Sequence, residues 1–327
     1  MRHAAPLVAA MLAMVPTPVP KRLQARFDAD RVYVEVRARN GATLEMYTDT
    51  GGGLLLSAAA ATRLGLTVRT PVAPSEKPAS GPGARVTDVP AFARDETAPP
   101  IPSDRPIAVV SKVAEIPGWP EQGDGILGQA WFAGHVWTWN YPAHRLTLRP
   151  DRWRPTGAAR RMPIGFKSAG GKRELNFPRI VVQVDGRPLS LLLDTGAETL
   201  LTPQALAAIH DGEPAFRATS MIAQSVFEGW ETAHPDWRVI EDAQMVTRSR
   251  MIEVPSVRIA GITVGPVWFT ERTDASFHKF MSAMTDARVE GSLGGNALAG
   301  LVMTLDYPRA QAWFTCKAHC TVARAGT

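Results

Sequence analysis

The chain has 327 residues, of which 45% are hydrophobic and 20% charged, and it contains 27 Gly and 27 Pro. This is a globular composition, long enough for two lobes with their own cores. The net charge is +5, from 36 basic and 31 acidic residues. Because the basic residues are scattered, and their densest group lies in a Pro- and Gly-containing stretch at 149–162, we expect a solvated basic surface and no nucleic-acid partner.

Residues 1–27 are predicted to form a leader. Met1-Arg2-His3 is a short basic start, and residues 4–15 form an apolar run. This pattern is typical of a secretory signal peptide, with a disordered Ala/Pro tail as the alternative. The run is shorter than the about 20 residues that a membrane-spanning helix needs. We therefore expect an exported protein, periplasmic or secreted, with no stable membrane span.

Short strands, turns and brief helices follow one another through both halves of the chain. In the first half, strands are predicted at 31–37, 44–47, 107–113, 136–139 and 145–148, and a helix at 58–64. In the second half, strands are predicted at 179–184 and 189–193, and a helix at 203–209. Residues 69–106 are rich in Pro, Gly, Ser and charge, and are either a disordered loop or a mobile hairpin over a cleft.

The tripeptide Asp-Thr-Gly occurs twice, each time after an apolar strand and before Leu-Leu and a short helix. The copies are Asp49-Thr50-Gly51 and Asp194-Thr195-Gly196, 145 residues apart. A single copy would indicate a surface turn. A carboxylate directly after an apolar strand needs a partner, however, because burying an unpaired charge is costly. Because the tripeptide occurs twice, the aspartate of each copy can be the partner of the other.

A second match indicates that the chain is internally duplicated. Residues 125–142 align with 291–308 without a gap, and nine of the eighteen positions are identical. This match is offset by 166 residues, so the second copy holds 21 extra residues between its two motifs. We predict an all-β fold of two related lobes. The predicted bounds are 28–148 and 164–320 for the lobes, 149–163 for a linker and 321–327 for a tail.

The two Asp-Thr-Gly turns, with the apolar-apolar-Gly turn at Ile126-Leu127-Gly128 and its second copy, resemble those of the aspartic proteases. The chain looks most like the retropepsin-like branch, fused into a single-chain, two-lobed pseudo-dimer. Over residues 28–316 the resemblance implies retropepsin- or pepsin-like barrel lobes with short helices and an active site at their interface. It implies that the catalytic pair is Asp49 and Asp194. It also implies that Thr50 and Thr195 lock the two loops together and that Gly51 and Gly196 let the backbone approach the carboxylates. The last pair, Gly128 and Gly294, would pack behind the loops.

The resemblance further implies an aspartic endopeptidase that acts as a monomer on peptides or proteins, with no cofactor and no metal. One ionised carboxylate would take a proton from a water held between the pair, while the other, protonated, would hydrogen-bond the scissile carbonyl. As in aspartic proteases generally, two such close carboxylates share one proton, and their apparent pKa values belong to the pair. We expect activity to peak below neutral pH.

Some positions depart from the family pattern. Gly52 stands where the family usually has Ser, Thr or Ala, and neither Gly52 nor Ala197 offers a hydroxyl to its aspartate. Candidate flaps over the active site are residues 80–85 in the first lobe and 227–237 in the second. The tryptophans at positions 230 and 237 are read as cleft residues or, more often in such lobes, as core.

Cys316 and Cys320 are expected to form a disulfide, which suits an exported protein. The alternatives are free thiols, or zinc bound together with His319, although three ligands within five residues make a poor tetrahedral site. The chain has no phosphate-binding loop, His-Glu-x-x-His pair or Gly-x-Ser-x-Gly elbow. Two rival functions remain on this fold: a non-catalytic protein that binds peptides or a partner, and a metal-dependent hydrolase. Two intact Asp-Thr-Gly turns favour the protease.

Overall fold

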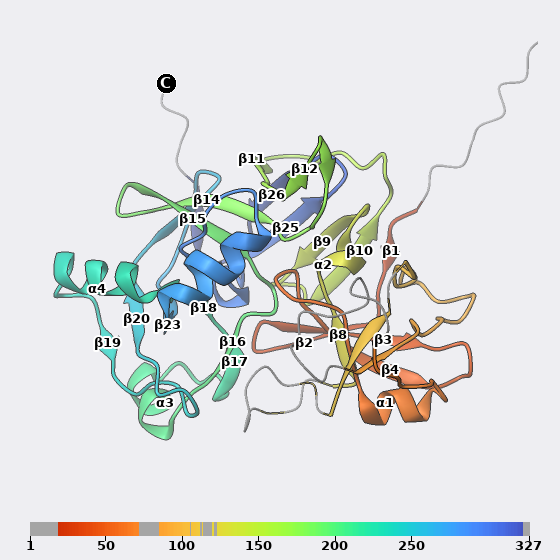
Figure 1. The fold of residues 1–327 in the computed structure, drawn as a ribbon. Helices are drawn as coiled ribbons and strands as arrows, with labels where there is room; N and C mark the ends of the chain where they lie inside the picture. The colour runs from red at the N-terminus through yellow and green to blue at the C-terminus, as the bar shows by residue number, and fades with distance from the viewer. Residues whose placement is uncertain are drawn as a thin grey trace, which may run out of the picture.

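The computed structural model describes residues 19–71, 85–104, 106–111, 113, 120 and 123–322. Two β-rich lobes, one from each half of the chain, lie side by side, and a sheet made by both halves joins them (Figure 1). The predicted class, all-β with two duplicated lobes and short helices, is confirmed.

The first lobe is built on a seven-stranded sheet whose interior strand β4 ends directly before Asp49. Alternating residues of β3 bury Val32, Val34 and Val36 completely, as expected for a strand with one face in the core. Helix α1 (Ala58–Arg63) begins after Ser57, whose hydroxyl accepts a hydrogen bond from the first turn of the helix. In sheet order the strands are β2 (Ala25–Asp28), β3 (Arg31–Arg37), β4 (Thr43–Thr48), β8 (Gly125–Leu127), β5 (Leu55–Ser57), β7 (Ile107–Val110) and β6 (Arg85–Thr87).

The second lobe repeats this plan in a ten-stranded sheet whose strand β15 ends directly before Asp194. In sheet order the strands are β19 (Val239–Ile240), β20 (Met251–Val254), β23 (Val267–Arg272), β18 (Ser220–Ala223), β24 (Gly291–Leu293), β15 (Arg187–Leu193), β14 (Arg179–Val184), β21 (Val257–Ile259), β22 (Ile262–Val264) and β27 (Cys320–Val322). The helical segments are α3 (Pro203–Ile209), α4 (Gln224–Ala233), η2 (Ala275–Met281), η3 (Ser282–Met284) and η4 (Gly295–Ala297). Two small hairpins lie apart from this sheet: β12 (Ser168–Ala169) with β13 (Lys172–Arg173), and β16 (Glu198–Leu200) with β17 (Phe216–Ala218).

A six-stranded sheet joins the lobes, and its centre marks the axis that relates them. Thr138 of β9 pairs with Thr304 of β25, and their hydroxyls are 2.8 Å apart. These two threonines are equivalent in the duplicated segments, so each lobe contributes the same strand. In sheet order the strands are β1 (Lys21–Arg22), β10 (Arg145–Arg149), β9 (Val136–Asn140), β25 (Leu301–Asp306), β26 (Gln311–Cys316) and β11 (Arg160–Pro163).

Aromatic side chains fill the core between this sheet and the first lobe. The short helix α2 (Gln129–Phe132) ends in two buried rings, and the ring of Trp131 lies 4.5 Å from that of Trp137. Phe132 lies 5.4 Å from Trp137 and also from Trp139. This packing fixes the segment that follows Gly128, and therefore the back of the first Asp-Thr-Gly loop.

Several segments differ from their predicted roles. Strands β1 and β2 pair with β10 and β3, so residues 21–27, assigned above to the leader, take part in the sheets. Strand β11 lies in the stretch predicted as a linker, 149–163, and pairs with β26. The strand predicted at 107–113 is shorter, ending at Val110. Residues 1–18, most of the leader, lie outside the described residues.

Candidate active site

The two Asp-Thr-Gly turns meet at the interface between the lobes. Each aspartate follows a central strand, and its backbone N–H hydrogen-bonds at 3.0 Å to the parallel neighbour, β8 or β24. Each carboxylate accepts the N–H of the glycine two residues on, at 2.8 Å from Gly51 to Asp49 and at 3.1 Å from Gly196 to Asp194. The side chains of Asp49 and Asp194 hydrogen-bond to each other. The structure thus brings together two carboxylates that are 145 residues apart in sequence.

The two threonines hold the loops together by crossed hydrogen bonds. The Thr50 hydroxyl donates to the carbonyl of Leu193 at 2.7 Å and accepts the N–H of Thr195 at 3.0 Å. The Thr195 hydroxyl donates to the carbonyl of Thr48 at 3.2 Å and accepts the N–H of Thr50 at 3.2 Å. Both threonines are fully buried, so these bonds form away from water. Each lobe therefore anchors the other at the position of the aspartates.

Burial sets the charge state of the pair. Asp49 is 3% exposed and Asp194 is partly buried. Burial raises the pKa of Asp194, and the hydrogen bond shared with Asp49 opposes that rise. A hydrogen bond between two carboxyl groups needs one proton, because two ionised carboxylates would only repel each other. The geometry therefore favours a pair that carries one proton and one negative charge.

Two duplicated tyrosines lie within electrostatic range of the pair. Tyr141 and Tyr307 are equivalent in the second sequence match, and both are at most 2% exposed. Burial raises the pKa of both phenols. The negative charges of Asp30 and then of Asp194 add to the rise for Tyr141; for Tyr307 the charge of Arg173 opposes the rise and that of Asp49 adds to it. Each tyrosine therefore stays neutral and is influenced by the aspartate of the other lobe. Their repetition was visible in the sequence, but nothing there connected them with the aspartates.

Gly128 and Gly294 lie behind the two loops, where no side chain fits. A Cβ atom on Gly128 would stand 2.2 Å from the carbonyl oxygen of Gly53. A Cβ atom on Gly294 would stand 1.8 Å from the carbonyl oxygen of Thr219. Both contacts are with backbone, which cannot give way without moving the loop. This pairing also makes Thr219 the structural counterpart of Gly53.

The 21 extra residues of the second copy lie directly behind Asp194. The first loop runs straight from Gly52 to Gly53. In the second lobe the equivalent residues, Ala197 and Thr219, are separated in sequence but joined by a hydrogen bond from the N–H of Thr219 to the carbonyl of Ala197, at 3.0 Å. The chain leaves the Asp194 loop after Ala197 and returns to it at Thr219. Residues 198–218, which contain β16, α3 and β17, are therefore the extra segment.

The sequence predicts that the strand and helix that follow Asp194 are equivalent to those that follow Asp49. The structure shows that this prediction is wrong, because the two strands occupy different positions in their sheets. Leu55 of β5 pairs with β8, and its counterpart beside β24 is Met221 of β18. Strand β18 and helix α4 thus occupy the place of β5 and α1, while β16 and α3 lie outside the main sheet. The match misled because Ser57 and Thr202 both cap a helix eight residues after an aspartate.

This placement also corrects one predicted flap. Most of 227–237 lies in or next to helix α4 and is not a hairpin. Trp230 and Trp237 have ring centroids 6.0 Å apart and pack against the core of the lobe, which agrees with the core interpretation. In the other candidate, residues 80–84 lie outside the described residues, and Arg85 begins β6.

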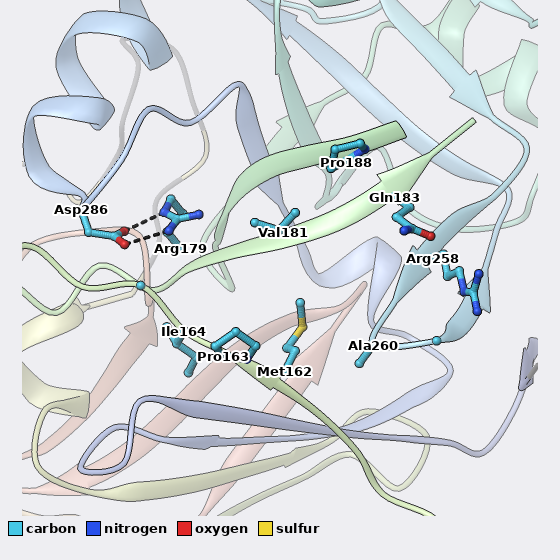
Figure 2. A pocket seen from close by; sticks show the side chains of 12 residues that line it. Met162, Pro163, Ile164, Arg179, Val181, Gln183, Pro188, Arg258, Ala260 and Asp286 are labelled. Atoms are coloured by element: carbon cyan, nitrogen blue, oxygen red, sulfur yellow. Dashed lines mark hydrogen bonds and ion pairs between the residues drawn. The ribbon is translucent and has the colours of Figure 1, made fainter. Parts of the chain in front are cut away.

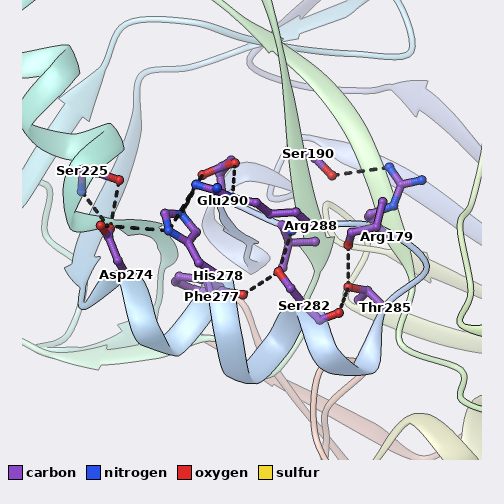
Figure 3. Close-up of polar contacts among 12 residues, drawn as sticks. Arg179, Ser190, Ser225, Asp274, Phe277, His278, Ser282, Thr285, Arg288 and Glu290 are labelled. Atoms are coloured by element: carbon purple, nitrogen blue, oxygen red, sulfur yellow. Dashed lines mark hydrogen bonds and ion pairs between the residues drawn. The ribbon is translucent and has the colours of Figure 1, made fainter.

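A helix with the wider π spacing, η2, packs over the Asp194 loop. Its buried Phe277 belongs to the same small apolar cluster as Ala197. Polar contacts hold this helix at its start and in its middle: Asp274, just before the helix, accepts the N–H of Ser225 at 2.9 Å, and Nε2 of His278 lies 2.7 Å from Oε2 of Glu290 (Figure 3). The second aspartate loop is thus supported from the side as well as from behind.

One described cavity lies away from the aspartates. It has a volume of about 570 Å³ and lies between residues 162–165 and strand β14 (Figure 2). At its rim the Arg179 guanidinium donates two hydrogen bonds to Asp286, at 2.6 and 2.8 Å. None of the predicted site residues lines it.

Cys316 and Cys320 form the predicted disulfide. Within the described ranges, no group of three or more His, Cys, Asp or Glu side chains is placed to hold a metal ion. No helix in the described part of the chain has the length and apolar character needed to cross a membrane.

Comparison with known proteins gives one kind of match. No protein-family profile matches the chain, and no curated protein matches its sequence. Among solved structures, the chain is similar to the crystal structure of aspartic proteinase from Irpex lacteus, at 11% sequence identity and a TM-score of 0.47. That match covers 92% of this chain and 98% of the other.

Proposed function

We propose that the protein is an aspartic endopeptidase in which Asp49 and Asp194 hydrolyse peptide bonds through a water molecule held between them. The observation that carries this proposal is the approach of the two carboxylates across the lobe boundary, each presented by a duplicated loop, each lying against the glycine of the opposite loop and each accepting the N–H of its own glycine. A fold that only bound peptides would have no need of a shared proton at this interface.

The chemistry follows from the single proton. The ionised carboxylate takes a proton from the water, whose oxygen attacks the scissile carbonyl carbon, while the protonated carboxyl hydrogen-bonds the carbonyl oxygen. The tetrahedral intermediate then breaks its C–N bond, and the amine nitrogen leaves with a proton from the pair. One carboxyl is again protonated and the other ionised at the end of the cycle. No covalent intermediate with the protein forms.

The residues around the two aspartates support this reaction by fixing the positions of the carboxylates. The crossed bonds of Thr50 and Thr195 fix both loops, and such preorganisation lowers the barrier because no reorganisation is needed when charge moves. Both aspartates come from one chain, so we propose a monomer with no cofactor. The disulfide supports an exported location, in which a protease of this kind would meet peptide or protein substrates.

The test is hydrolysis of a denatured protein between pH 3 and pH 8 by the wild type, Asp49→Asn and Asp194→Asn. Each substitution alone should reduce turnover to background, because asparagine keeps the shape but cannot carry the proton. Asp185→Asn is the matched control: this aspartate lies in the turn after β14, its side chain is 50% exposed, and turnover should not change.

Three results would count against the proposal. Full activity in either site variant would show that the pair is not catalytic. A wild type that binds peptides without cleaving them at any pH would favour the non-catalytic rival. Activity that a chelator abolishes would favour the metal-dependent one.

A further inference from the structure

The outer edge of strand β14 has a gap in its hydrogen bonding at Val181. Every second residue of β14 faces this edge. Arg179 exchanges two backbone hydrogen bonds there with Gly165, at 2.8 and 3.0 Å. Gln183 pairs with Arg258 of β21. Val181 lies between these two contacts, and no described residue pairs with it on this side. One backbone donor and one backbone acceptor of the sheet are therefore open at Val181.

The first lobe fills the equivalent place with its own chain. The counterpart of Val181 is Glu35, because each pairs with a residue four positions before the aspartate of its lobe. The N–H of Glu35 donates to the carbonyl of Gln24 at 2.9 Å, and the Gln24 side chain bonds the Glu35 carboxylate at 2.8 Å. Gln24 follows strand β1, but the corresponding strand of the second lobe, β11, stays with the six-stranded sheet up to the N–H of Ile164. The second lobe therefore lacks the residue that closes this edge in the first.

The cavity of about 570 Å³ lies at this gap (Figure 2). Val181 and the two contacts that flank it all line the cavity. Val181 is 45% exposed, although it lies in the middle of its strand. The uncharged side chains of the lining are mainly aliphatic: Met162, Pro163, Ile164, Val181, Pro188 and Ala260. Such a lining favours a ligand that brings an aliphatic side chain.

The charged groups that line the cavity leave one positive charge uncompensated. Asp286 accepts two hydrogen bonds from the Arg179 guanidinium, at 2.6 and 2.8 Å, so these two charges cancel. The Arg258 side chain is exposed and forms no ion pair or hydrogen bond with the described residues. It lies on the same face of the sheet as Val181 and is its diagonal neighbour, a position that a long side chain can span. A backbone N–H and a guanidinium near one another are donors suited to a carboxylate.

The gap admits one ligand residue beside β14 and not a passing strand. Arg179 and Gln183 are about 14 Å apart along β14, because each residue of an antiparallel strand rises about 3.4 Å. Gly165 and Arg258 already occupy both ends of this interval. A ligand residue can pair with Val181 only, and its chain must leave toward solvent. The end of a peptide meets this condition, whereas a continuous strand would collide with both neighbours.

We propose that this cavity binds the carboxyl-terminal residue of an extended peptide that belongs to another protein. The N–H of that residue donates to the Val181 carbonyl, as in an added β-strand, and its carboxylate accepts the Val181 N–H and the Arg258 guanidinium. An aliphatic side chain at this position packs against Pro163 and Pro188. Because neither aspartate lines the cavity, the site is separate from the active site and does not depend on the proposed function.

Two peptides test this site in the whole chain carrying Asp49→Asn, a substitution expected to prevent digestion. The peptide Ser-Gly-Ser-Ala-Val carries a fluorescent group at its amino end and ends in a free carboxylate or in an amide. Fluorescence anisotropy should show saturable binding of the free acid and at least tenfold weaker binding of the amide, which has no charge to offer Arg258. Equal affinity of the two peptides, or no binding of the free acid at millimolar concentrations, would overturn the proposal.

Three further substitutions in the same protein locate the bound carboxylate. Arg258→Gln should weaken binding of the free acid at least tenfold and leave the amide unchanged. Val181→Pro removes the open N–H, which an edge position tolerates, and should weaken binding of both peptides. The matched control is Arg187→Gln, which changes an exposed arginine of β15 that does not line the cavity, and it should leave binding unchanged. Equal losses in the two arginine variants would reduce the effect to net charge and contradict the site.

Sedimentation of the unlabelled protein distinguishes a peptide of another protein from a second copy of this chain. A monomer at all concentrations agrees with the proposal. Self-association that Arg258→Gln abolishes would assign the cavity to a second copy and overturn it.

Discussion

Gly196 of the second lobe lies against Asp49 of the first: a Cβ atom built on Gly196 would stand 2.1 Å from Cγ of Asp49. The relationship is reciprocal, because a Cβ atom on Gly51 would stand 2.5 Å from Cγ of Asp194. Each aspartate is therefore bounded by the glycine of the opposite loop. These glycines are needed for close approach between the lobes rather than for the turn alone.

Gly196→Ala should lower kcat/KM by about 10²-fold or more, because a new methyl group must displace the Asp49 carboxylate by roughly an ångström. Gly229→Ala, in α4, is the matched control: nothing lies within 4 Å of its Cβ position. It should leave activity unchanged and stabilise the protein by about 0.5–1 kcal/mol, since alanine is the better helix former. Kinetics and thermal unfolding measure both. An active Gly196→Ala enzyme would contradict the close approach.

Thr50→Val should destabilise the protein while keeping its shape. It removes a donor from the carbonyl of Leu193 and an acceptor from the N–H of Thr195, both buried. Each orphaned group costs about 1–3 kcal/mol. Thr50→Ser retains the hydroxyl and should lose far less. Denaturant unfolding distinguishes them, and equal stability of the two variants would show that the crossed bonds contribute little.

Gly52→Ser should reduce activity, although it introduces the hydroxyl that this position lacks. A Cβ atom on Gly52 would stand 1.9 Å from Oδ2 of Asp49, so the carboxylate occupies the space of a side chain. Ala197→Ser, at the equivalent position, adds only an oxygen to a Cβ that is already present, and should keep kcat within a few-fold. The measurement is kcat of both variants and of the wild type. A Gly52→Ser enzyme faster than the wild type would contradict the close contact between Gly52 and the Asp49 carboxylate.

Asp30→Asn should raise stability at neutral pH but not at pH 3. Burial, and then the negative charge of Glu213, raise the pKa of Asp30 from 3.8 to about 6, while Arg217 opposes the rise. Between these values the folded protein holds a proton that the unfolded chain has lost, so stability falls as pH rises through this window. Asparagine is neutral throughout, and it suits the positive φ of 63° at this residue.

The measurement is the melting temperature of both proteins from pH 3 to pH 8. The curves should coincide below pH 4 and separate above it, with the variant the more stable. Curves that stay parallel over the whole range would show that Asp30 titrates as an ordinary surface carboxyl.

The all-β class, the duplication and the identity of the paired aspartates could be predicted from the residues alone. These features are local or repeated. Alternating strands such as 31–37 have a period of two that is visible in any window, and the repeated Asp-Thr-Gly and Gly-containing turns mark the same position twice. The two offsets, 145 and 166, even counted the extra residues of the second lobe.

The position of those 21 residues and their contacts could not be predicted in this way, because they depend on how distant strands pair in the folded protein. Two strand–helix units follow Asp194, and both suit the same local rules: Thr202 caps α3 just as Ser57 caps α1, yet β18 and α4 take the place in the sheet. The choice depends on which strand pairs with β24, a contact between residues some seventy positions apart. The same holds for Gly196 against Asp49, since a glycine's neighbour across a lobe boundary leaves no trace in the residues beside it.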